Sequence, residues 1–211
     1  PFYNHEKMFS EIKTYLNNCK STNFWDEGTI LSNIKSILNH YMGKPPTSFK
    51  YNGKTHTPKS FLKNATKLKP NNYVDFMSLM EKPYWSQEEY KVPDNWWRSD
   101  DYYNVPLEDF MFAIKNAIKN GYSISIGGDV SESGYSSTHD VAMVPSYDIP
   151  SEHIDENARQ FRFSNKTTTD DHAIHLIGYK IDEKGDWWFL IKDSGSGARN
   201  GNFPGYYFYH E

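Results

Sequence analysis

The C-terminal end of the chain carries three short apolar segments separated by turn residues. Residues 172–180, 187–192 and 206–209 are rich in Ile, Leu, Tyr, Trp and Phe, which favour β-strands. The Asp182–Gly185 segment between the first two is a hairpin signal. These segments predict an antiparallel sheet, and any fold assigned to the chain has to contain it.

The segments before this sheet have mainly helical patterns. Apolar residues recur at helical spacing between residues 7 and 42 and predict two helices, with Asp26 as the cap of the second. Cys19 lies on the apolar stripe of the first helix, so we expect a buried, inert thiol. Residues 106–119 predict an amphipathic helix, and residues 122–126 predict a strand. Helices followed by antiparallel strands are an α+β pattern.

Two regions show little periodicity. Residues 71–97 are rich in Tyr, Trp and Pro and predict a long loop packed down by its own aromatic side chains. Residues 131–168 are rich in Ser, Asp and Pro and predict an extended excursion. We expect a helical and insertion region over residues 1–101 and a β-rich half-domain over residues 102–211.

Composition and charge exclude several functions. The net charge of −4 leaves no basic excess for binding nucleic acid. The apolar runs are far shorter than the roughly 20 residues of a membrane span. One cysteine allows no internal disulfide and leaves a cytoplasmic or an exported protein open. The aromatic content of 17% indicates a folded protein and leaves open a glycan-binding module that uses Trp96–Trp97 and Trp187–Trp188.

His172 is the residue most suited to chemistry. It opens a predicted strand, directly after a turn of Thr and Asp residues, where a side chain can reach a cleft. His175 follows three residues later and therefore points to the opposite face of the strand, which argues against a shared metal site. We expect neither a metal nor a cofactor. The residues alone also allow a structural His172 bonded to Asp171.

The surroundings of His172 resemble those of a known family. Asp171-His172-Ala173-Ile174, then Gly178-Tyr179, a hairpin and Ile191-Lys-Asp-Ser194, resemble the block that holds the catalytic His and its partner in papain-like cysteine peptidases. The resemblance implies that His172 is the general base and that Asp193 orients its ring. It implies a papain-like fold, with this chain forming the C-terminal antiparallel β-rich half plus a helical insertion.

Upstream motifs follow in the order of the bleomycin-hydrolase-like branch. These motifs are Phe49–Lys54, Thr57–Phe61, Asn71–Val74, Val92–Trp96, Tyr103–Leu107, Asn120–Tyr122 and Gly128–Gly134. The resemblance implies a cysteine peptidase that removes residues from the end of a peptide. It implies that Gly128, Asp129 and Asp171 bind the substrate, although Asp129 equally fits a turn cap.

The sequence departs from the family pattern at two places. No Cys-Trp segment is present, and Cys19 does not fit that motif, so we expect the nucleophile to lie upstream of this sequence and this chain alone to be inactive. Asp193 replaces an Asn, and Gly195-Ser196 replace a Trp-Gly whose Trp shields the His–partner bond from water. A degenerate, peptide-binding homologue therefore stays an alternative, and a homo-oligomer is left open.

Overall fold

The computed structural model describes residues 3–145, 147 and 149–211. The chain divides into two compact units, the first ending at Asn72 and the second running from Tyr73 to Glu211. Each unit is described by itself. The regions expected over residues 1–101 and 102–211 stay a prediction, because compactness does not test which residues form an insertion.

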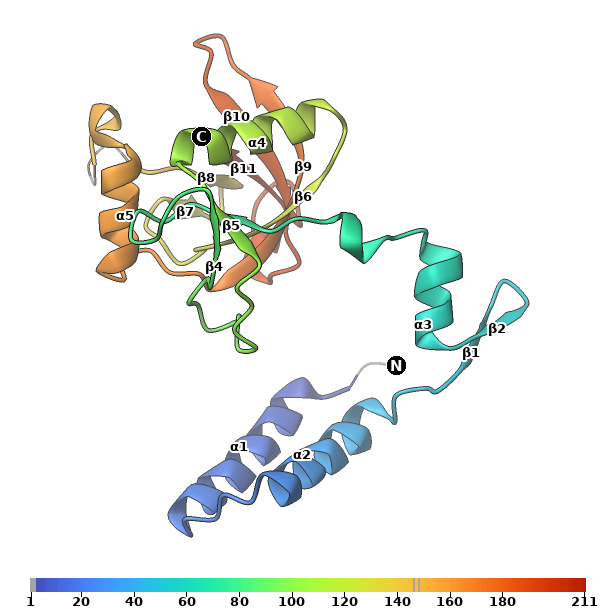
Figure 1. The fold of residues 1–211 in the computed structure, drawn as a ribbon. Coiled ribbons are helices and arrows are strands. Elements are labelled where there is room, and N and C mark those ends of the chain that lie inside the picture. The colour runs from blue at the N-terminus through green and yellow to red at the C-terminus, as the bar shows by residue number, and fades with distance from the viewer. Residues whose placement is uncertain (1–2, 146, 148) are drawn as a thin grey trace. The chain divides into compact units, whose positions relative to one another are not determined.

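The first unit begins with the two expected helices, α1 (His5–Ser21) and α2 (Glu27–Met42), which lie side by side (Figure 1). Asp26 caps α2 as predicted, because its carboxylate accepts a hydrogen bond of 2.8 Å from the Thr29 N–H. Cys19 is only 2% exposed, which confirms the buried thiol.

The rest of the first unit is a small hairpin followed by short helical turns. Strands β1 (Phe49–Tyr51) and β2 (Lys54–His56) pair across Asn52 and Gly53, whose positive φ values of 48° and 76° suit a tight hairpin turn. The remaining elements are α3 (Pro58–Phe61), the π-helix η1 (Leu62–Thr66) and the 3₁₀ turn η2 (Pro70–Asn72).

The second unit opens with a three-stranded sheet that the sequence did not reveal. Its order is β3 (Phe76–Met77), β5 (Tyr102–Asn104), β4 (Ser86–Glu88). The prediction of a loop packed down by its own aromatic residues is wrong, since Trp85, Trp96 and Trp97 are exposed. Hydrogen bonds from the fully buried Asn104 side chain to Leu79, Lys82 and Pro83 hold the segment instead.

A curled six-stranded sheet forms most of the second unit. Its strand order is β6 (Ile124–Gly128), β9 (His172–Ile181), β10 (Trp187–Lys192), β11 (Tyr206–His210), β8 (Val141–Ala142), β7 (Tyr135–Ser136). All pairs are antiparallel except β8 with β11. The three C-terminal strands and their turn confirm the predicted antiparallel sheet, and the α+β class is confirmed.

Helix α4 (Leu107–Lys119) supplies the apolar face that the concave sheet buries (Figure 1). Ile114 and Ile118 of the helix pack with inward residues of the strands, which are Ile174, Leu176, Trp187, Phe189, Ile191 and Tyr207. Burial of this apolar surface is the main stabilising contribution to the unit. None of the helices in the described part of the chain is long and apolar enough to cross a membrane.

The excursion expected over residues 131–168 contains a helix, α5 (Glu156–Ser164), and a 3₁₀ turn, η3 (Ser151–His153). The prediction of an extended segment is therefore wrong there. Polar side chains anchor α5: Glu156 accepts from the Leu107 N–H, Arg159 donates to the Ser78 carbonyl, and Gln160 accepts from the Met80 N–H. No apolar periodicity is needed for such anchoring, so the pattern in the sequence gave no signal.

Candidate active site

His172 is the first residue of β9, a strand that lies between β6 and β10 in the curled sheet. Its backbone is in register with Gly128, the last residue of β6. Ile174 and Leu176 lie on the same face of β9 as His172 and are buried in the core. The His172 side chain keeps 27% of its surface exposed, so its ring can meet another molecule or segment.

Asp193 directly follows β10 and meets the His172 ring. Strand β10 is antiparallel to β9, with Lys192 opposite His175. The end of β10 therefore lies beside the start of β9. Nε2 of His172 lies 2.7 Å from Oδ1 of Asp193, whose side chain is 3% exposed. An ionised carboxylate only accepts hydrogen bonds, so Nε2 carries the hydrogen and a neutral imidazole keeps its lone pair on Nδ1.

The Asp193 carboxylate has three hydrogen-bond donors. Oδ1 accepts from His172 and from the Gly195 N–H at 2.7 Å, and Oδ2 accepts from the Tyr135 hydroxyl at 3.3 Å. Burial opposes ionisation, but these donors outweigh burial and hold the pKa of Asp193 below its ordinary value. Asp193 is therefore ionised at neutral pH.

The loop before His172 is built from carboxylate-to-backbone hydrogen bonds. Asp171 accepts from the Val130 N–H at 3.1 Å, so the alternative in which Asp171 holds His172 is wrong. Asp129 accepts from the N–H groups of Ser131 and Thr169, both at 2.7 Å. Asp129 thus has the geometry of a turn cap, and the substrate-binding roles of Gly128, Asp129 and Asp171 stay a prediction.

The sequence from residue 12 to residue 209 matches the Peptidase C1-like family. This chain belongs to the Peptidase C1-like family. The resemblance to papain-like cysteine peptidases of the bleomycin-hydrolase branch, inferred from the motifs around His172, is thereby confirmed. A search of curated proteins finds no similar sequence.

A solved structure of another protein supports the family fold. The structure is PepW from Lactobacillus rhamnosis HN001, which superposes with a TM-score of 0.62 at 17% sequence identity. The match covers 97% of this chain and 50% of the PepW chain, so the chain spans about half the length of that peptidase structure. At this identity the likeness concerns the fold alone.

Gly195 lies next to the His172–Asp193 pair. A Cβ atom at Gly195 would lie 3.1 Å from Oδ1 of Asp193 and 3.5 Å from Nε2 of His172. A side chain at this position would therefore begin in contact with the pair, and the glycine that stands in place of the Trp of the family motif supplies none. The Asp193 carboxylate is nevertheless buried, and the Tyr135 hydroxyl donates to its Oδ2. The strand pattern gave no signal for Tyr135, which approaches from the far edge of the sheet.

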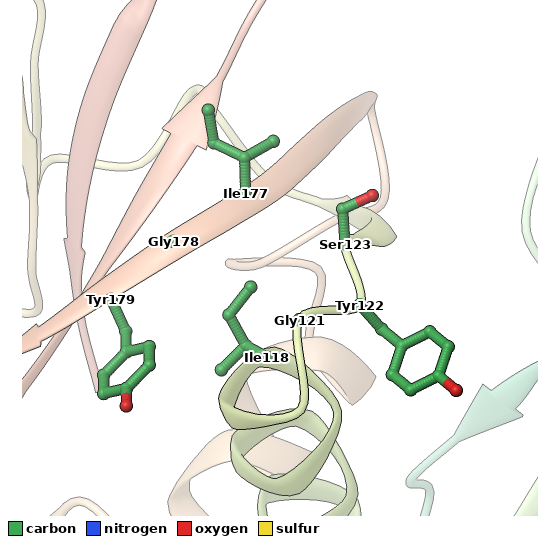
Figure 2. A pocket seen from close by; sticks show the side chains of 7 residues that line it. All are labelled: Ile118, Gly121, Tyr122, Ser123, Ile177, Gly178 and Tyr179. Atoms are coloured by element: carbon green, nitrogen blue, oxygen red, sulfur yellow. The ribbon is translucent and has the colours of Figure 1, made fainter.

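His172 itself lines neither of two hollows in the second unit. One of about 520 Å³ is lined by Ala173, His175, Lys192 and Arg199, and also by Asp193, the partner of His172. The other, of about 300 Å³, lies between the end of α4 and β9, and Figure 2 shows Ile118 beside the strand while the Tyr122 ring points away from it. The larger hollow thus borders the His172–Asp193 pair through Asp193, whereas no acidic residue lines the smaller one.

The tryptophans considered as platforms for a sugar differ in their exposure. Trp187 is buried and stacks on Tyr179 with ring centroids 4.8 Å apart, so it is no exposed platform for a sugar. Trp96 and Trp97 are exposed and pack edge to face. No group of three or more His, Cys, Asp or Glu side chains that could hold a metal ion occurs among residues 3–145, 147 and 149–211.

Proposed function

We propose that this chain supplies the general base and its orienting carboxylate to a cysteine peptidase. The observation that carries the proposal is the His172–Asp193 contact of 2.7 Å, in which a buried, ionised carboxylate holds Nε2 of a partly exposed imidazole. Cys19, the single cysteine of the sequence, is buried in α1. The proposal therefore takes the nucleophile from a segment outside this sequence.

In the proposed reaction, Nδ1 of His172 takes the proton of the thiol, and the thiolate attacks the carbonyl carbon of the peptide bond. The resulting imidazolium then gives this proton to the departing amine, and an acyl-enzyme forms. Water hydrolyses the acyl-enzyme with His172 again acting as the base. Throughout the cycle Asp193 keeps the hydrogen on Nε2 and stabilises the imidazolium by its charge.

The substrate of this proposal is a peptide. In this proposal Gly128, Asp129 and Asp171 are the wall that faces the peptide beside His172, since Gly128 is in register with His172 and Asp171 precedes it. Both oxygens of the Asp129 carboxylate are occupied by Ser131 and Thr169, so this wall offers the substrate mainly backbone groups. The preference for removing residues from a peptide end rests on the bleomycin-hydrolase-like motifs alone.

The test is covalent labelling of the full-length protein that contains this chain. A peptide-like, thiol-reactive probe is applied to the wild type, to His172→Ala and to the matched control His175→Ala. His175 lies on the same strand, is exposed and points to the opposite face. We expect labelling of a cysteine outside this sequence in the wild type and in the control, and its loss in His172→Ala. Equal labelling of all three proteins refutes a role for His172 as the base.

The departures at Asp193 and Gly195 favour a second candidate, a degenerate homologue that binds peptides without cleaving them. In that case no cysteine of the wild type reacts with the probe, while a peptide ligand still protects the protein against thermal unfolding. Probe labelling and thermal unfolding of the same protein preparation thus distinguish a peptidase from a peptide-binding protein.

A further inference from the structure

Tyr135 reaches the candidate active site from the far side of the sheet. It lies on β7, and in the strand order β11 and β8 separate β7 from β10. The curl of the sheet brings its hydroxyl to 3.3 Å from Oδ2 of Asp193, a residue 58 positions away in the sequence. The contact is therefore a product of the tertiary fold.

The Tyr135 ring is held rigidly on a neighbouring tyrosine. It stacks on the ring of Tyr207 with centroids 4.3 Å apart and an interplanar angle of 27°. Tyr207 is fully buried, and its hydroxyl donates to the Gly197 carbonyl at 3.1 Å. The position of the Tyr135 hydroxyl is consequently fixed by packing.

The two carboxylate oxygens of Asp193 accept hydrogen bonds from different donors. Oδ1 accepts from His172 and from the backbone of Gly195, whereas the hydrogen bond to Oδ2 comes from Tyr135. Without that hydroxyl, Oδ2 would lose its donor in a buried place, and the carboxylate plane could turn away from the imidazole. Removal of one partner from a buried charged acceptor is costly.

The Tyr135 hydroxyl is suited to the role of a permanent donor. Burial, together with the nearby Tyr207, Tyr209 and Asp193, raises the pKa of its phenol well above the ordinary value, so it stays protonated at neutral pH. The Tyr207 hydroxyl is also within reach of it. The carboxylate is the stronger acceptor of the two and takes the hydrogen.

We propose that Tyr135 is a positioning residue of the His172–Asp193 pair, holding Oδ2 of Asp193 so that Oδ1 stays in line with Nε2 of His172. This inference rests on the proposed function. It also explains how the pair can keep its geometry with Gly195 in place of the Trp of the family motif, because Tyr135 holds the Asp193 carboxylate at Oδ2.

The chain contains a matched control for Tyr135→Phe. Tyr209 belongs to the same aromatic cluster, with its ring 6.3 Å from that of Tyr135, and its buried hydroxyl has no hydrogen-bond partner among the residues that the structure describes. Tyr135→Phe and Tyr209→Phe each remove one hydroxyl oxygen from this cluster. Only the first removes a hydrogen bond to Asp193.

The experiment compares the full-length wild type with both variants by two readouts. The first is the rate of labelling by the thiol-reactive peptide probe. We expect Tyr135→Phe to lower it about 10-fold, corresponding to one hydrogen bond to a charged group, and Tyr209→Phe to leave it unchanged. The second is the titration of the Asp193 carboxyl carbon by NMR. We expect it to move to higher pH in Tyr135→Phe alone.

The two readouts test the positioning role of Tyr135 separately from the proposed peptidase function. A shifted Asp193 titration in a protein that no probe labels supports the positioning contact and overturns the peptidase. In a protein that the probe labels, an unchanged labelling rate in Tyr135→Phe overturns the positioning role, whatever the titration shows. Equal effects of Tyr135→Phe and Tyr209→Phe overturn it as well, since they would indicate a general loss of packing.

Discussion

Replacement of Asn104 by alanine is the most quantitative test of the second unit. The Asn104 side chain is 0% exposed. Its Oδ1 accepts from the Leu79 N–H at 2.8 Å, and its Nδ2 donates to the carbonyls of Leu79, Lys82 and Pro83 at 2.9 to 3.0 Å. One side chain thus closes the turn between β3 and β4.

The cost of Asn104→Ala follows from the groups that lose their partner. A buried polar group left without a hydrogen bond costs about 1–3 kcal/mol. The Leu79 N–H becomes such a group, and the carbonyls of Lys82 and Pro83 lose their Asn104 donor as well. The Leu79 carbonyl still accepts from the Lys82 N–H at 3.3 Å. We therefore expect a loss of about 3 kcal/mol in the free energy of unfolding. For a domain of this size the loss corresponds to a fall in Tm of roughly 6–12 °C.

Thermal unfolding followed by circular dichroism measures the global effect, and hydrogen exchange at the Leu79 amide measures the local one. Asn200→Ala is the control, because Asn200 is exposed and its side chain forms no hydrogen bond with any described residue. A Tm within about 2 °C of the wild type, with the Leu79 amide still protected, would refute the assignment of Asn104 as the residue that holds this turn.

Three further predictions concern the site and its surroundings. Gly134→Ala should destabilise the chain by more than about 3 kcal/mol in urea unfolding, because its Cβ would lie 1.7 Å from the Met143 carbonyl oxygen, whereas Gly197→Ala, whose Cβ meets nothing within 4 Å, should change little. The lowered pKa of Asp193 means that its ionised form stabilises the fold above the ordinary carboxyl pKa of about 3.9, and that this contribution is lost as the pH falls through the lower folded value. Urea unfolding at several pH values should therefore show a stability difference between wild type and Asp193→Asn that shrinks below about pH 4, and a difference independent of pH would contradict the reasoning. Cys19 should resist a small thiol reagent in the folded chain and react fully in denaturant, and rapid reaction of the native chain would show that α1 does not bury it.

The sequence predicts those elements whose residues lie close together along the chain. The β9–β10 hairpin is within reach of pattern analysis, because Asp182 and Gly185 form the turn through a local 3.1 Å hydrogen bond. The His172–Asp193 contact could be anticipated only through the family motif, since it joins the start of one strand to the end of the next.

Other features depend on contacts that no local pattern encodes. Helix α5 is missed because Glu156 and Arg159 anchor it through polar bonds to distant backbone, which leaves no apolar period to detect. Tyr135 is missed because its partner lies across a curled sheet. The short strands β3 to β5 are missed because buried Asn104, and not an aromatic cluster, organises them.

The strand order of the curled sheet has a consequence for the time course of folding. Strands β9, β10 and β11 are neighbours in sequence, whereas β6 pairs with β9 only after residues 129–171 have been closed into a loop. That loop is roughly three doublings longer than the β9–β10 turn, which adds about 2 kcal/mol of closure entropy to the later step. We expect pulsed hydrogen exchange to find amides of the β9–β10 hairpin protected before those of β6. His172 and Asp193 would then meet early within this hairpin, and Tyr135 would complete the arrangement last.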